Sequence, residues 1–266
     1  GNIDFVGNVI IKGDVLTGFK VKAKGDIYVG GIIESAEVIA GGSITVAKGI
    51  TMGLNERNGI VKAGGNVQAP FIMNANVEAD GDVLFSKYIM NSNVRAGGKI
   101  DTVGDRGLII GGNLQASSYI RARSIGNVME TKTHVEVGAN PFINNRFKLL
   151  QKEAEELKVT IEKVTKALNV LNQLESKMGS LPPDKARLRI QLKNTKQISE
   201  NQILEKQEEM EDLKGKFIDY HKSYVEILEE IFPGTTVKIG PLKENINDYI
   251  RNTRFYISSD NDITHG

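Results

Sequence analysis

The sequence predicts a mainly β protein, a β-solenoid interrupted by a long antiparallel coiled-coil hairpin. Three observations support this prediction. A Gly-centred phrase recurs in the first half, 23 of the 28 glycines lie between Gly1 and Gly138, and an apolar 3-4 repeat follows them. These changes of texture divide the chain into three expected segments, residues 1–141, 142–232 and 233–266.

The repeat in residues 1–141 has the alternating pattern of short β-strands. Its best copies are VKAKGDI, VIAGGSI, VKAGGNV, VEADGDV and VRAGGKI, which begin at residues 21, 38, 61, 77 and 94. A coil of ~17 residues at ~3.3 Å per residue has a perimeter of ~56 Å, which fits a narrow β-helix. The Val, Ile and Ala positions are therefore expected to face inward and to stack in columns, with glycine at the corners.

Gly-rich loops also bind phosphate groups, but a phosphate loop occurs once, between a strand and a helix. Here the phrase recurs between strands, and neither GxGxxG nor GxxxxGK[ST] appears. The spacing between Gly42 and Gly65 is longer than the others and predicts a loop over residues 52–59. Leu54 and Arg57 in this loop are candidate interaction residues, although a surface insertion without function explains the loop as well.

From Phe147 to Met178, apolar residues follow the 3-4 spacing of a coiled-coil seam. The stretch MGSLPPD at 178–184 predicts a turn, with Gly179 as the C-cap of the first helix and Pro183 at the start of the second. The returning arm is expected to run on through Tyr224 and Ile227, with a weaker middle where Ser199 and Lys206 occupy seam positions.

The predicted tip of this hairpin contains three candidate contacts for a protein partner, Met178, Leu181 and Pro182. An exposed apolar tip suggests recruitment of a partner, whereas the simpler interpretation is that these residues fold the turn. After residue 233, the alternating segments TTVKI and TRFYI predict strands again. We expect this last segment to return to the C-terminal end of the solenoid and to cover its open edge.

The order of these parts resembles the flagellar assembly protein A family. The phrases that carry the resemblance are GDVLTGFKVKAKGDIYVGGIIE at 13–34, VKAGGNVQAPFI at 61–72, TKTHVEVGANP at 131–141 and LPPDK at 181–185. The resemblance implies a right-handed β-helix with a protruding coiled coil and no enzymatic activity. It also implies a cytoplasmic bacterial protein linked to flagellar assembly or its regulation, and a further N-terminal domain that this chain lacks. The chain opens inside a repeat, so we expect it to be a fragment whose N-terminus is missing.

Composition excludes several classes of partner and site. Lys and Arg number 34 against 33 Asp and Glu, so neither nucleic acid nor an anionic membrane is an expected partner. The chain has no cysteine and no apolar run of about 18 residues, so thiolate metal sites and membrane insertion are not expected. Its three histidines, at 134, 221 and 265, are scattered in sequence. We expect no cofactor and no metal site.

Three functions remain open. The first is a scaffold that recruits a protein partner through the hairpin. The second is a bactofilin-like structural protein that self-assembles, and a homo-oligomer is possible in either case. The third is a β-helix enzyme acting on a carbohydrate or acyl substrate, for which Asp14, Asp26 and Asp82 could form a carboxylate column. The corresponding residues in other coils, Ser43, Asn66, Lys99 and Asn113, indicate turn chemistry instead.

Overall fold

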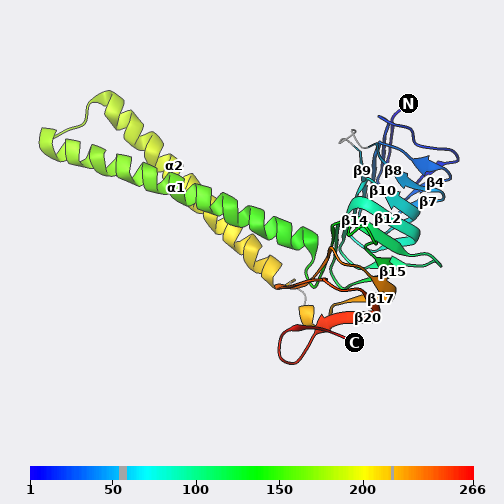
Figure 1. Ribbon diagram of the computed structural model, residues 1–266. Helices are drawn as coiled ribbons and strands as arrows, with labels where there is room; N and C mark the ends of the chain where they lie inside the picture. The colour runs from blue at the N-terminus through cyan, green and yellow to red at the C-terminus, as the bar shows by residue number, and fades with distance from the viewer. Residues whose placement is uncertain (54–58, 217–218) are drawn as a thin grey trace. The chain divides into compact units, whose positions relative to one another are not determined.

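A computed structural model describes residues 1–53, 59–216 and 219–266 (Figure 1). The chain forms two compact units, which are described separately. One consists of Gly1–Phe142 together with Ile218–Gly266, and the other of Ile143–Phe217. The first unit is a β-solenoid of about seven turns, as the repeat predicts, and the second contains two helices.

Among the described residues, every coil of the solenoid contains one or more β-strands. Sixteen of them precede the helices: β1 Ile3–Phe5, β2 Val9–Ile11, β3 Lys20–Ala23, β4 Ile27–Val29, β5 Ile32–Ile33, β6 Glu37–Ala40, β7 Ile44–Val46, β8 Gly49–Thr51, β9 Ile60–Ala63, β10 Val67–Met73, β11 Asn76–Ala79, β12 Val83–Ala96, β13 Ile100–Thr102, β14 Leu108–Ala116, β15 Tyr119–Ile125 and β16 Thr133–Val137. Five follow them: β17 Tyr224–Ile231, β18 Thr235–Ile239, β19 Leu242–Asn245, β20 Ile250–Ile257 and β21 Ile263–His265.

Parallel pairing between successive coils arranges these strands in three walls. The first wall contains β1, β3, β6, β9, β11, the end of β12, the end of β14, β16 and β18. The second contains β2, β4, β7, the starts of β10 and β12, β13, β15 and β17. The third contains β5, β8, the end of β10, the middle of β12, the start of β14 and the ends of β15 and β17.

Inward side chains stack in columns, which confirms the pattern predicted from the repeat. In the third wall, register places one β-branched residue above another through Val15, Ile33, Ile50, Ile72, Ile89, Ile109, Ile125 and Ile231. All of them are buried. Such side chains fit a pleated surface well, and each buried one contributes roughly 1.5–3 kcal/mol by leaving water.

The glycine of the repeated phrase is needed because the coil below approaches it closely. A Cβ on Gly42 would lie 2.1 Å from the Asp26 side chain, and one on Gly98 would lie 2.1 Å from that of Asp82. The Asp26 carboxylate accepts a hydrogen bond from the next coil's backbone, Ser43 N–H, at 2.7 Å. The same contact recurs along one corner, through Asn8, Asp26, Ser43, Asn66, Asp82 and Lys99.

The corner column consists of hydrogen bonds between successive coils, and its membership differs from the one expected. Asp14 pairs at a different corner, where its carboxylate accepts from Ile32 N–H at 2.8 Å. Asn113 is also outside the column, because register aligns it with Asn93 in the first wall. A Gly-Asp dipeptide recurs at two corners of the coil, so sequence spacing alone did not distinguish them.

At its C-terminal end the solenoid changes from parallel to antiparallel pairing. Strand β20 runs antiparallel to β17, β19 antiparallel to β18, and β21 antiparallel to β20. The expected second helical arm was too long, because α2 ends at Lys214. Tyr220 lies in a short 3₁₀ helix, Tyr220–Lys222, and Tyr224 and Ile227 lie in β17.

The second unit contains α2, Pro183–Lys214, and all of α1, Pro141–Met178, except its first two residues. A four-residue turn joins the two helices (Figure 1). Gly179 ends α1 as predicted: its φ is +77°, in the left-handed region, and its N–H donates to Glu175 O at 2.8 Å. Pro183 is the first residue of α2, where the missing N–H of proline costs no hydrogen bond.

Candidate interaction surfaces

The turn between α1 and α2 contains the three candidate residues of the tip. Met178 is 60% exposed, whereas Leu181 and Pro182 are half-buried. The carbonyl of Pro182 accepts from Ala186 N–H at 2.9 Å, so this proline also helps to begin α2. The other two candidates, Leu54 and Arg57, lie outside the described residues.

Within the helical unit, ion pairs connect α1 to α2 at three levels. Arg146 pairs with Glu209, Glu153 with Lys206, and Glu175 with Arg189. As the residue number rises along α1, the partner's number falls along α2. Five residues of α1 at predicted seam positions are buried: Leu150, Ala154, Val164, Leu168 and Leu171.

The weak middle of the predicted seam has a structural explanation. Ser199 is the only buried residue of α2 in the described part of the chain, and its small size suits that position. Lys206 is tolerated at a seam position because it forms an ion pair with the Glu153 carboxylate of α1. An ion pair at a seam position gives little net stability but fixes the register of the two helices.

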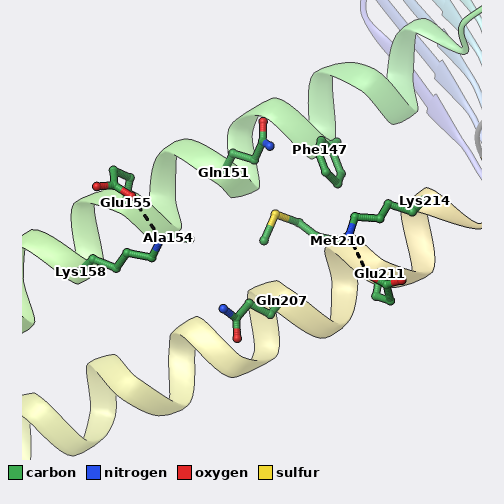
Figure 2. A pocket seen from close by; sticks show the side chains of 9 residues that line it. All are labelled: Phe147, Gln151, Ala154, Glu155, Lys158, Gln207, Met210, Glu211 and Lys214. Atoms are coloured by element: carbon green, nitrogen blue, oxygen red, sulfur yellow. Dashed lines mark hydrogen bonds and ion pairs between the residues drawn. The ribbon is translucent and has the colours of Figure 1, made fainter.

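Two open hollows lie between α1 and α2 near this ion pair, and Glu153 and Lys206 themselves line the second. One hollow, of about 470 Å³, is lined by Phe147, Gln151, Ala154, Glu155, Lys158, Gln207, Met210, Glu211 and Lys214 (Figure 2). Figure 2 shows the Met210 side chain extending from α2 toward α1, and the Phe147 ring extending from α1 toward α2. A second hollow, of about 430 Å³, includes Leu157 and Gln202.

The outer face of the first wall is a polar ladder. Glu78 pairs with Lys62 and Arg95 from the coils on either side. Beside it, amide groups form a chain in which Asn113 donates to Asn93 at 3.0 Å, and Asn93 donates to Asn76 at 3.0 Å. These ion pairs and amide hydrogen bonds join one coil to the next, so a structural role is sufficient to explain them.

The outer face of the second wall combines aromatic and charged side chains. Tyr119 stacks on Tyr224 at a centroid distance of 4.9 Å. The buried Asp101 carboxylate accepts from Arg121 Nε at 2.7 Å and from the Tyr119 hydroxyl at 3.0 Å. The hydrogen bond to Asp101 raises the pKa of Arg121, and burial raises the pKa of Tyr224. Because these groups satisfy one another's hydrogen-bonding requirements, they are interpreted as a network that supports the structure.

Sequence reasoning missed an apolar strip on the outer face of the third wall. It is formed by Phe71, Met73, Tyr88, Met90, Leu108 and Ile110, all half-buried. The rings of Phe71 and Tyr88 stack at 5.2 Å. Outward-facing apolar residues at 71, 73, 88 and 90 were visible as breaks in the polar alternation of the repeat, the signal that could have revealed the strip.

No cluster of three or more His, Asp or Glu suited to a metal ion occurs among the described residues. His134 is exposed on the first wall beside Asn113, and His221 stacks on Tyr220 at 4.5 Å. None of the helices in the described ranges is long and apolar enough to cross a membrane.

Comparison with protein-family models matches residues 1–263 to the Flagellar Assembly Protein A beta solenoid domain. The match covers nearly the whole chain and confirms the resemblance seen in the repeat phrases. Searches of curated proteins and of solved structures found no match.

Proposed function

The chain belongs to the Flagellar Assembly Protein A β-solenoid family, and from this membership we propose that it is a non-enzymatic cytoplasmic scaffold in flagellar assembly or its regulation. Its solenoid is right-handed in this proposal, and α1 and α2 form an antiparallel coiled-coil hairpin. The order of the interhelical ion pairs supports the hairpin. A protein partner binds at the turn between the helices.

The observation that carries the proposal is the exposure of Met178 at the end of a 38-residue helix, beside Leu181 and Pro182. An apolar side chain at such a place is stabilised by a partner that removes it from water. Interfaces of this kind are enriched in methionine because its flexible thioether adapts to the facing surface.

A gene-replacement experiment tests this function in the bacterium that encodes the chain. Deletion is expected to change the number or placement of flagella, and the wild-type gene to restore them. The gene carrying Leu181→Asp is expected not to restore flagella, because a charge at the tip opposes burial of the turn against the partner. Ser180→Asp, in the same turn, is the matched control and is expected to restore flagella. Unchanged flagella after deletion would refute the flagellar role, and rescue by Leu181→Asp would refute the role of the tip.

A second candidate function, self-assembly in the manner of bactofilins, is favoured by the first coil of the solenoid. Strands β1 and β2 pair only with β3 and β4 among the described strands, and Phe5, Val6 and Ile10 are exposed there. A second copy or another segment of the same protein would fit this edge. Growth of large species in light scattering, abolished by Ile10→Lys, is the result expected from end-to-end assembly.

A further inference from the structure

The face of α2 that points away from α1 carries exposed apolar side chains. Ile190, Ile198 and Leu204 are 60%, 57% and 58% exposed. At about 100° per residue they lie within roughly one third of the helix circumference, opposite the seam residues Leu192 and Ile203. Three polar residues, Asn194, Gln197 and Asn201, lie on the same arc. We call this arc the outer face of α2.

The charges of α2 are divided between its two halves. Residues 183–199 contain five Lys and Arg and one Asp, a net charge of +4. Residues 200–214 contain two Lys and six Asp and Glu, a net charge of −4. The helix dipole does not explain this division, because it favours acidic side chains near the N-terminus of a helix and basic ones near the C-terminus, which is the opposite order.

Helix α1 does not match this division either. Residues 141–159 contain four basic and three acidic side chains, and residues 160–178 contain three and two, so each half has a net charge of +1. In the described part of the chain, five charged residues of α2 make no ion pair: Arg187 and Lys193 in the basic half, and Glu205, Glu208 and Asp212 in the acidic half. All five lie on or beside the outer face.

We propose that the outer face of α2 pairs antiparallel with the same face of a second copy of this chain. Antiparallel pairing places the basic half of each helix against the acidic half of the other, whereas parallel pairing would oppose like charges. The surface is self-complementary about a twofold axis near the level of Ser199, so the association closes at a dimer.

The apolar and amide residues fit this pairing. Ile190, Ile198 and Leu204 leave water in the contact. Asn194, Gln197 and Asn201 lie in the middle third, where amide pairs across a coiled-coil seam select one register and orientation at some cost in stability. The pairing concerns two copies of the chain and does not depend on the flagellar role or on a partner at the tip.

Charge exchange between two variants of the full chain tests the proposal. Arg187→Glu with Lys193→Glu makes the outer face acidic throughout, and Glu205→Lys with Glu208→Lys makes it basic except at Asp212. Each variant alone is expected to raise the dimer dissociation constant at least about tenfold. In a twofold-symmetric contact, every pair of like charges that a variant creates occurs twice. An equimolar mixture of the two is expected to restore the dimer. Sedimentation between about 1 and 200 µM at low salt provides the measurement.

The matched control reverses two charges on the outer face of α1, Lys163→Glu with Lys166→Glu, and is expected to leave the dimer intact. Circular dichroism verifies that all variants keep their helices. A monomeric wild-type chain at every concentration overturns the proposal. So does a dimer that is insensitive to the α2 reversals, or one disrupted by the α1 reversals instead.

Cysteine trapping tests the orientation, since the natural chain has no cysteine. Ile198→Cys lies near the proposed axis and is expected to form a disulfide-linked dimer under mild oxidation. Two Ile190→Cys positions would be ~27 Å apart along the axis in the antiparallel pair, at ~1.5 Å per residue, and are expected to remain reduced. Equal crosslinking at both positions would indicate a parallel pair and overturn the proposal.

Discussion

Arg146 holds Glu209 in a bidentate ion pair, although 63 residues separate them in sequence. Its Nε donates to Glu209 Oε1 at 2.6 Å and its Nη2 to Oε2 at 2.7 Å. The pair ties the N-terminal part of α1 to the C-terminal part of α2. Because the guanidinium donates to the carboxylate, the pKa of Glu209 lies below its ordinary value.

This pair predicts a pH-dependent effect of Arg146→Gln. A carboxyl whose pKa is lowered by folding stabilises the folded state above its unfolded pKa, and this contribution disappears as the pH falls through the folded value. Arg146→Gln should therefore lower the melting temperature of the helices more at pH 7 than at about pH 2.5. Circular dichroism melts of both chains at the two pH values provide the measurement. Lys148→Gln, a nearby exposed change, should have little effect at either pH, and an equal loss at both would contradict the linkage.

The isoleucine column predicts a large cavity effect at Ile89. This side chain is fully buried between those of Ile72 and Ile109 in the neighbouring coils. Ile89→Ala should reduce the free energy of unfolding of the solenoid by about 2–5 kcal/mol, and Ile89→Val by about 0.5–1.5 kcal/mol. Denaturant titration measures both. Val103→Ala, at an exposed site, should change it by less than about 0.5 kcal/mol.

The corner column predicts that Asp26 acts through its shape and not through its charge. Asp26→Asn keeps an oxygen that accepts from Ser43 N–H, so stability should change by less than about 0.5 kcal/mol. Asp26→Ala removes the acceptor and should cost about 1 kcal/mol. A much larger cost for the asparagine variant would show that the carboxylate charge is needed and would reopen the possibility of a cation or catalytic site on this corner.

The sequence predicted the solenoid well because the coil repeats its requirements. Every coil needs small or β-branched residues facing inward, as at Val61 and Ala63, and a glycine wherever the side chain of the coil below lies against it, as at Gly65. The same residue requirements therefore recur in each coil, and the resulting periodicity makes the solenoid recognisable in the sequence. The turn at Gly179 was equally clear, because glycine and two prolines end and restart a helix for local reasons.

The parts that sequence missed depend on register or on ambiguous spacing. Tyr224 and Ile227 continue the 3-4 spacing of the helix, and they also fit strand β17, where contact with β15 and β20 decides the outcome. Asp101 and Arg121 are 20 residues apart, and only the pairing of β13 with β15 brings them together. The number of residues between paired positions in successive coils varies along the chain, so no fixed sequence interval predicts that Arg121 contacts Asp101.

Arg121 and Arg123 provide a last prediction, because both lie on β15 and differ mainly in their carboxylate partner. Arg121 donates through Nε at 2.7 Å and through Nη2 at 3.0 Å to Asp101, whose side chain is only 4% exposed. Arg123 donates to Glu229, whose side chain is 49% exposed. Removal of Arg121 leaves a buried carboxylate with fewer donors, whereas water can replace Arg123.

Arg121→Gln should therefore reduce the free energy of unfolding by about 2 kcal/mol, and Arg123→Gln by less than about 1 kcal/mol. Denaturant titrations of the full chain at neutral pH compare the two. Raising the salt concentration should diminish the Arg123 effect more than the Arg121 effect, because buried pairs are screened less. Equal losses for the two variants would mean that Tyr119 and Lys99 supply Asp101 with enough donors to replace those of Arg121.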